Sequence, residues 1–228
     1  EANSVAVLDG LVAVAVEAEE TGDAGLVLFT NLDGEVLAQH TAGFLPDMLT
    51  FTPNGMHVVV ANEGEPNDDY SIDPIGSVPI IDLPADRDPA GATVRHVDFT
   101  QYDGEENEMR EAGIRIYGPG ASASQDFEPE YVAISSDSTT AYVALQENNA
   151  VAVIDLVAGA VDTLLPLGFK DWSGLLMDAS NRDDGANLAS WPVHGIYQPD
   201  AMTLYTVNGE DYLVTANEGD ARDYDTYS

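Results

Sequence analysis

The sequence predicts an all-β protein, a β-propeller of four-stranded blades. Three observations predict this fold: a hairpin pattern that recurs along the 228 residues, two further strand-like runs after each hairpin, and weak helix signals. Turn clusters recur roughly every 8–12 residues, which is typical of meandering sheets. Propellers are built from about 4–8 such blades around a channel. A β-sandwich is the main alternative, but a sandwich does not require its sequence to repeat.

Each repeat begins with a β-hairpin. In three of the four copies, proline and an acidic residue precede the first strand, and a turn such as Pro53–Gly55 or Asn208-Gly209 leads into a second strand rich in Val and Ala. A degenerate copy opens the chain around the Asp9-Gly10 turn. Turns of this kind between two β-rich runs are typical of hairpins. Because the second run shows little alternation, we expect it to be buried on both faces.

Two more strands complete each unit. The expected blades cover residues 4–40, 47–98 and 129–165, with half of a fourth over residues 200–228. Insertions at 101–127 and 170–197 interrupt the repeat, and Glu105 to Ala112 is expected to form a turn or two of helix. A closed ring needs more strands, and natural proteins avoid unpaired strand edges. We therefore expect about three and a half blades of a propeller domain that continues in a longer protein.

The composition excludes several classes of function. The chain has 41 acidic and 7 basic residues, a net charge of −34, no cysteine and 44% hydrophobic residues. Such a surface repels phosphate backbones, which excludes nonspecific nucleic-acid binding, while the apolar content distinguishes the chain from a disordered acidic tail. No apolar run approaches the ~20 residues of a membrane span, and no disulfide or thiolate metal site is possible.

The acidity also suggests a habitat and a class of partner. Near-absence of lysine together with many carboxylates suggests a saline environment, where counterions screen their repulsion. The alternative is a soluble, acidic secreted protein without salt adaptation. In either case divalent cations are natural partners, because hard cations prefer oxygen ligands.

A duplicated acidic loop is the most specific local signal. The stretch that begins Asn62-Glu63-Gly64 resembles the one that begins Asn217-Glu218-Gly219. In a propeller, equivalent positions of different blades face one axis, so we expect a polar ring there that binds Ca²⁺. The predicted metal ligands are Asn62, Glu63, Asp68, Asp69, Glu147, Asn217, Glu218, Asp220 and Asp223. The alternative is that Asn-Glu-Gly is a turn-forming sequence that duplication has repeated, and that its acidic side chains are solvated. A second acidic stretch, 178–187, is a weaker candidate for a cation loop.

The second insertion carries three aromatic residues, Trp172, Trp191 and Tyr197. They are candidates for lining a ligand groove, although such aromatics also anchor long loops. The four histidines show no zinc-binding spacing, and no serine lies in a nucleophile-elbow motif. Catalytic residues therefore cannot be assigned from the sequence.

Four stretches carry a resemblance to a known family: 62–70, 145–155, 165–171 and 215–224. Together they resemble the choice-of-anchor I family, which is related to mesenchyme-specific cell-surface glycoproteins. The resemblance implies a secreted or cell-surface propeller of seven blades, within proteins often much longer than this chain. Some members are labelled alkaline phosphatase or are joined to phosphoesterase domains, and the eukaryotic relatives are linked to biomineralisation. The family offers no catalytic residue that can be placed on this sequence.

Two functional hypotheses follow. The first is an extracellular or cell-surface binding or structural module that is associated with calcium. Its expected partners are divalent cations, other cell-surface or matrix components, or the rest of a longer chain. The alternative is a metal-dependent phosphomonoesterase that uses metal-bound water. Against the enzyme, the chain has one lysine and six arginines with which to hold a phosphate.

Overall fold

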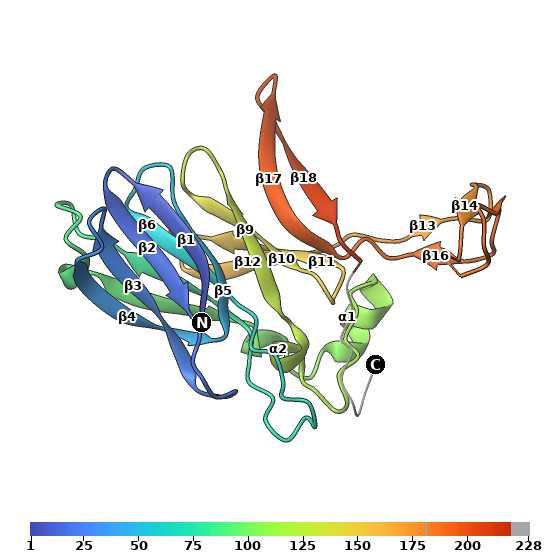
Figure 1. Cartoon of the computed structure of the whole chain (residues 1–228), viewed down its shortest axis with the longest axis horizontal. Coiled ribbons are helices and arrows are strands. Elements are labelled where there is room, and N and C mark those ends of the chain that lie inside the picture. The colour runs from blue at the N-terminus through green and yellow to red at the C-terminus, as the bar shows by residue number, and fades with distance from the viewer. Residues whose placement is uncertain (181, 220–228) are drawn as a thin grey trace.

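Three four-stranded antiparallel sheets and a two-stranded one follow each other around a common axis (Figure 1). The computed structural model describes residues 1–180 and 182–219. In every four-stranded sheet the strands pair in chain order. The predicted fold class, an all-β propeller of four-stranded blades, is confirmed.

The strands of the four sheets have the following bounds. The first sheet contains β1 (Ala2–Leu8), β2 (Leu11–Val16), β3 (Ala24–Asn31) and β4 (Val36–Phe44). The second contains β5 (Pro46–Phe51), β6 (His57–Asn62), β7 (Ser77–Asp82) and β8 (Thr93–Asp98). The third contains β9 (Pro129–Ile134), β10 (Thr140–Leu145), β11 (Ala150–Asp155) and β12 (Ala160–Pro166). The last is the hairpin of β17 (Pro199–Val207) and β18 (Glu210–Asn217).

The predicted hairpin turns adopt the expected backbone. Asp9 and Gly10 have φ values of 50° and 88°, and Asn208 and Gly209 have 53° and 82°. Two consecutive residues with positive φ match the twist of the flanking strands. The registers agree, since Leu8 pairs with Leu11 across the first turn.

The first strand of every sheet faces one central channel. A cavity of about 350 Å³ is lined by residues of all four innermost strands, among them Asn3 of β1, Asp47 of β5, Tyr131 of β9 and Asp200 of β17. Each of these strands has a shift in pairing register near its start, as a β-bulge produces. A common channel lined by the inner strands is the geometry of a propeller.

Apolar side chains fill the spaces between sheets. One core lies between the first and second sheets and includes Phe29 and Ile81, both with no exposed surface. A second joins the second and third sheets and includes Phe99 and Phe127, whose rings meet edge to face at 5.2 Å. β6 is buried along nearly its whole length, as expected for a strand covered on both faces. In β2 and β18 the burial of successive side chains alternates instead, because one face of each strand is more exposed than the other.

The two insertions differ in how they pack. The first contains the short helices η2 (Thr100–Tyr102), α1 (Glu106–Ala112) and α2 (Ala123–Asp126), and α1 confirms the predicted helix. The second projects as an arm (Figure 1) of two small ribbons, β13 (Lys170–Asp171) with β16 (His194–Gly195) and β14 (Met177–Asp178) with β15 (Leu188–Ala189). These ribbons lie in a segment for which the sequence predicted no strands. A further short helix, η1 (Pro89–Gly91), precedes β8.

Two arginines connect neighbouring sheets. Arg87 Nη1 lies 2.7 Å from Asp9 Oδ2 in the first sheet, and its Nη2 donates to the Asn54 carbonyl in the second. Arg95 donates to both oxygens of Asp82, at 2.6 and 2.8 Å, and to the carbonyl of Leu156 after the third sheet's β11. A guanidinium suits this position because its fork reaches several acceptors at once.

The Asp82 carboxyl is held in its charged form by these contacts. Burial alone raises the pKa of Asp82, but hydrogen bonds and charge from Arg95 and His57 outweigh burial, so the pKa is lowered. The His57 Nδ1 atom lies 2.6 Å from Asp82 Oδ1. Arg95 and Asp82 thus form a small network between the second and third sheets.

We expect Arg95→Lys to destabilise the fold by roughly 1–2 kcal/mol, because lysine keeps the charge but loses the forked contacts. Urea unfolding measures this difference. Arg182→Lys is the control, because Arg182 lies exposed in the arm. Equal midpoints for the two variants would show that Arg95 does not connect the sheets.

Candidate functional site

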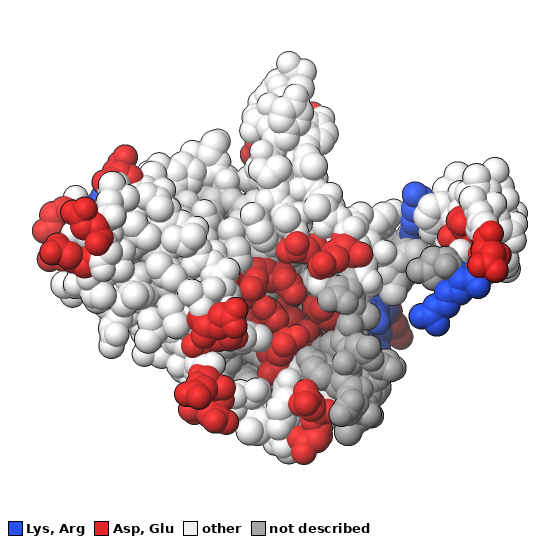
Figure 2. Space-filling view, in the orientation of Figure 1, with Lys and Arg blue, Asp and Glu red and all other residues white. Residues whose placement is uncertain are grey.

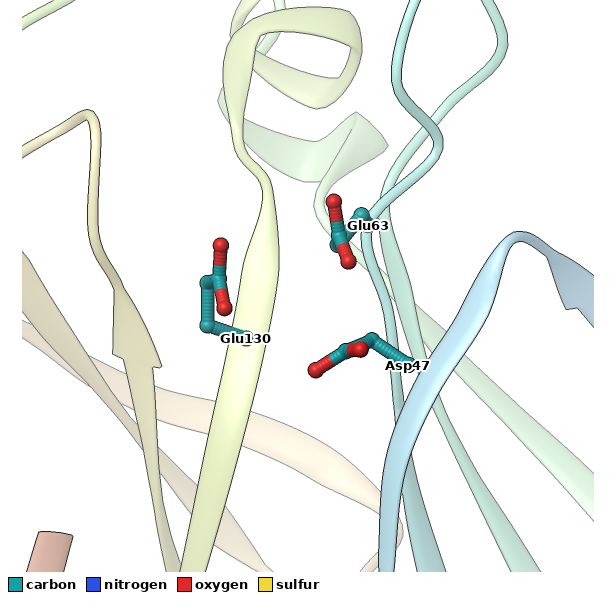
Figure 3. A group of neighbouring side chains, drawn as sticks. All are labelled: Asp47, Glu63 and Glu130. Carbon is teal, nitrogen blue, oxygen red and sulfur yellow. The ribbon is translucent and has the colours of Figure 1, made fainter. Parts of the chain in front are cut away.

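Three carboxylates meet at the end of the central channel. The side chains of Asp47, Glu63 and Glu130, here called the axial carboxylate cluster, each offer an oxygen, and these oxygens all lie within 4.8 Å of one another. All three side chains are partly buried. Figure 3 shows them directed into the same space from the β5, β6 and β9 region. The cluster therefore lies between the second sheet and the third.

Local backbone geometry places these side chains. Pro46 pairs with Asn62 whereas Met48 pairs with Ala61, so Asp47 is the extra residue of a β-bulge. β9 shows a similar shift just after Pro129, next to Glu130. Bulges re-aim side chains, and a proline at the first strand position costs no ladder hydrogen bond. The Pro-acid pairs therefore direct carboxylates towards the axis.

Glu63 reaches the same place from the other strand of its hairpin. It follows β6 directly, and its N–H donates to the carbonyl of Leu45, 3.0 Å away. The next residue, Gly64, has φ 68°, and a Cβ there would lie 2.6 Å from the Ile75 carbonyl oxygen. Only glycine fits this turn without strain. The Asn-Glu-Gly sequence thus ends the strand and leaves Glu63 beside the start of β5.

Burial and mutual repulsion keep protons on the cluster. Burial, then the charges of Asp200, Glu65 and Glu17, raises the pKa of Asp47 to about 6. Burial, then repulsion led by Glu147, raises the pKa of Glu130 to about 8. The pKa of Glu63 is raised to about 11, again first by burial and then by neighbouring acids led by Glu130. The cluster is therefore an electrostatically unfavourable place for three negative charges.

More acids surround the cluster. In Figure 2 acidic side chains gather at the centre of the face shown. The carboxylates that raise the pKa values of the three cluster members come from every sheet: Glu17, Glu65, Glu128, Glu147 and Asp200. Among the described residues, no lysine or arginine forms an ion pair with a cluster member.

The geometry fits one hard divalent cation. Oxygens that bind a single Ca²⁺ at about 2.3–2.6 Å lie no more than about 5 Å apart, and the three cluster oxygens meet that limit. Calcium takes about 6–8 oxygen ligands, which include carbonyls and waters. Three carboxylates can therefore supply part of its coordination shell. The Oδ1 atom of buried Asn62, adjacent to Glu63, has no hydrogen-bond partner among the described residues.

The pairing registers place four polar residues at equivalent positions of the four sheets, and their forming a calcium-binding ring stays a prediction. Glu17, Glu63, Gln146 and Glu218 each follow the residue that pairs with the start of the inner strand. Gln146 Nε2 donates to Glu218 Oε2 at 3.1 Å, which connects the third sheet to the fourth. In the third sheet Gln146 holds the ring position, and Glu147 is the next residue, buried and beside Glu130.

The other predicted ligands lie apart from the cluster or beyond the described chain. Asp69 is exposed and accepts a hydrogen bond from the Ser71 N–H, and its pKa is lowered mainly by Ser71. Asp68 lies in the same loop and is exposed. Asn217 is exposed and accepts from the Thr215 hydroxyl. Asp220 and Asp223 lie outside the described residues.

Sequence reasoning missed Asp47 and Glu130. The signal was in the sequence, since Pro46-Asp47, Pro129-Glu130 and Pro199-Asp200 open three successive inner strands. The sequence shows only that these pairs precede a strand, and gives no reason for the acidic side chains to point inwards. The bulges supply that reason.

Two of the three aromatic side chains of the second insertion, Trp172 and Trp191, contact the insertion's own strands, whereas Tyr197 is held through its main chain. Lys170 Nζ lies 4.2 Å from the centre of the Trp172 ring. Trp191 Nε1 donates to the Met177 carbonyl at 3.2 Å. The Tyr197 N–H donates to Asn149 Oδ1 at 3.0 Å, where the arm returns to the third sheet. These contacts match the anchoring alternative, and a ligand groove at Trp172, Trp191 and Tyr197 stays a prediction.

The acidic stretch 178–187 forms local turns in its described part. Asp178 Oδ1 accepts from the Ser180 N–H, and Ser180 Oγ accepts from the Arg182 N–H. Across residues 1–180 and 182–219, no helix has the length and apolar character needed to span a membrane.

Comparison with known proteins gives a family and a fold. The model of the Choice-of-anchor I domain family matches residues 1–228. The "Mesenchyme-specific cell surface glycoprotein" of Strongylocentrotus purpuratus is 42% identical over 98 residues, which are 42% of this chain and 13% of that protein. The chain thus spans a small part of that relative.

Solved structures are similar at low sequence identity. A crystal structure of a protein from Lactobacillus plantarum has 14% identity and a TM-score of 0.53, covering 95% of this chain and 48% of that one. The β-propeller domain of Cps50 (Swd1) from Myceliophteria thermophila has 11% identity and a TM-score of 0.48, covering 74% of this chain and 44% of that one. At such identity the Lactobacillus structure supports the fold alone. This chain spans about half the length of these proteins.

The raised pKa values predict that the metal-free protein loses stability as pH rises from about 4 to 8. Above the carboxyl pKa of the unfolded chain, about 4, the unfolded state releases protons that the folded cluster retains. Unfolding therefore becomes easier through the pKa values near 6 and 8. Melting temperatures in EDTA between pH 5 and pH 8 measure this trend.

Glu63→Gln is the matched variant, because it removes, at nearly constant shape, one carboxyl that keeps its proton in the folded state and releases it on unfolding. It should flatten the fall in melting temperature, whereas exposed Asp69→Asn should leave the fall unchanged. An unaltered slope in Glu63→Gln would contradict the electrostatic description of the cluster.

Proposed function

The chain belongs to the choice-of-anchor I domain family, and from that premise we propose that it is a cell-surface β-propeller module held together by an axial calcium ion. The observation that carries the proposal is the approach of Asp47, Glu63 and Glu130 oxygens to within 4.8 Å. The surface location is supported by the name of the sea-urchin relative, a cell surface glycoprotein. The module would act by binding or by structural support.

The ligand chemistry favours calcium over softer metals. The cluster supplies carboxylate oxygens from Asp47, Glu63 and Glu130, and the chain contains no cysteine. Oxygen-only sites suit Ca²⁺, Mg²⁺ or Mn²⁺, whereas zinc and copper prefer nitrogen or sulfur. Ca²⁺ tolerates irregular geometry better than Mg²⁺, which demands a near-ideal octahedron. Because the three carboxylates come from three separate segments, we expect the coordination geometry to be irregular.

A bound cation would act on the fold as well as on the surface. Asp47 and Glu63 belong to the second sheet and Glu130 to the third, so one ion would cross-link two blades. It would replace the protons that the cluster otherwise retains, and binding to the folded state alone raises stability. Acidic loops around the axis would then be presented on a rigid frame, as a cell-surface or matrix contact requires.

The phosphomonoesterase alternative stays a prediction from the family resemblance. Metal-assisted phosphate hydrolysis needs positive groups on the transferred phosphate as well as a metal. In the described part of the chain, no lysine or arginine forms an ion pair with Asp47, Glu63 or Glu130. The cluster geometry therefore favours a binding or structural role.

Calcium titration by calorimetry tests the proposal. The EDTA-treated chain, returned to buffer of fixed high ionic strength, should bind about one calcium ion in a saturable step and gain melting temperature. Glu63→Gln and Glu130→Gln should each weaken the affinity by roughly tenfold or more, because affinity follows the charge of the ligands. Asp69→Asn is the matched control and should bind normally.

Equal affinity in Glu63→Gln and in the control would refute the axial site. The same samples, tested with p-nitrophenyl phosphate, separate the two functions. Turnover that needs a divalent ion and is lost in Glu63→Gln would favour the enzyme over the structural module.

A further inference from the structure

Two arginines line a surface pocket on the side of the third sheet, apart from the axial cluster. The cavity has a volume of about 260 Å³, and its lining includes Arg110, Ile114, Arg115, Ile116, Tyr117 and Phe169. Among the described residues, no Asp or Glu lines it. In a chain with 41 acidic and 7 basic residues, a pocket with two guanidinium groups and no carboxylate in its lining requires an explanation.

Both guanidinium groups are held by carbonyl oxygens. Arg110 Nε donates to the Ile116 carbonyl at 2.7 Å, and Arg115 Nη1 donates to the Glu147 carbonyl at 2.7 Å. Neither forms an ion pair with a carboxylate in the described part of the chain, whereas Arg87 and Arg95 both do. Arg110 Nη1 also donates to Asn107 Oδ1 at 3.0 Å, and the charge of Arg110 helps to lower the pKa of nearby Glu106. These contacts fix the two groups in place and leave further N–H donors on each guanidinium.

Local structure fixes the rest of the pocket. Gly113, with φ 96°, ends α1 and turns the chain towards the third sheet. There the Arg115 N–H donates to the Asn148 carbonyl, and Asn148 Nδ2 donates to the Arg115 carbonyl. These paired bonds set the main chain of Arg115 on the turn between β10 and β11. The pocket thus rests on a rigid support.

Aromatic and aliphatic groups form its walls. The Arg115 guanidinium lies 4.3 Å from the centre of the Tyr117 ring. Phe169 is 50% exposed, next to Gly168, whose carbonyl accepts a bond from Asn149 Nδ2. Ile116 is buried beneath. The pocket therefore offers an apolar surface beside the two forks.

We propose that this pocket binds an oxyanion, carboxylate or sulfate, carried on a small body with an apolar face, as in acidic sugars. Guanidinium forks recognise planar or tetrahedral oxyanions with paired hydrogen bonds. An apolar wall with few polar groups is typical of small-ligand pockets. The net charge of −34 opposes an anion at long range, but salt screens that repulsion beyond about 8 Å and leaves the direct contacts. The proposal does not depend on the axial calcium site.

The test uses the whole chain in EDTA at physiological salt, so that calcium bridging at the axial cluster is absent. Calorimetric titrations with glucuronate and with N-acetylglucosamine 6-sulfate show whether carboxylate or sulfate is preferred. Neutral N-acetylglucosamine tests binding of the sugar ring without a charged group. Inorganic sulfate tests binding of the charged group without a sugar ring. At least one acidic sugar should bind at one saturable site, and neutral N-acetylglucosamine should not.

Variants assign the binding to the pocket. Arg110→Gln should weaken the acidic sugar by about tenfold or more, the size expected for lost charge-assisted bonds. Phe169→Ala should weaken the sugar but not inorganic sulfate. Arg182→Gln removes the same charge from the exposed arm and should change nothing. Arg110 and Phe169 are exposed, so both variants are expected to fold.

Three results would overturn the proposal. The first is no saturable binding of either acidic sugar. The second is equal binding of the neutral sugar. The third is unchanged affinity in Arg110→Gln, or an equal loss in Arg182→Gln.

Discussion

The repulsion among carboxylates at the propeller axis is the constraint on which the rest of the structure depends. Every inner strand begins beside the same channel, so acids at repeated positions are forced together. Asp47, Glu63 and Glu130 reach within 4.8 Å of each other and are partly buried. Such a group is tolerated only when protons or a cation neutralise it. The raised pKa values and the proposed calcium site are two outcomes of this one geometry.

Positive charge is scarce in this chain, and its placement is correspondingly informative. Arg87 and Arg95 connect neighbouring sheets through Asp9 and Asp82. Arg110 and Arg115 are held by carbonyls beside an apolar wall instead. The fold is thus connected by arginines at its periphery and, in our proposal, by a cation at its centre.

Much of the fold could be predicted because its signals are local. The Asp9-Gly10 and Asn208-Gly209 turns fix hairpins through backbone geometry alone. The site was less accessible to sequence reasoning. Glu63 was found because its loop is duplicated, but Asp47 and Glu130 point to the axis only through bulges that depend on strand pairing. The same dependence on register places Gln146, and not Glu147, in the polar ring, a one-residue difference that sequence cannot resolve.

The central claim is that a divalent cation binds at the axis between the second and third sheets. Anomalous diffraction from crystals of the chain soaked with a lanthanide, which takes calcium-type oxygen ligands, locates the ion directly. We expect the strongest peak between the carboxylates of Asp47, Glu63 and Glu130. A map with no peak there, or with its strongest peak in the 178–187 loop, would contradict the account.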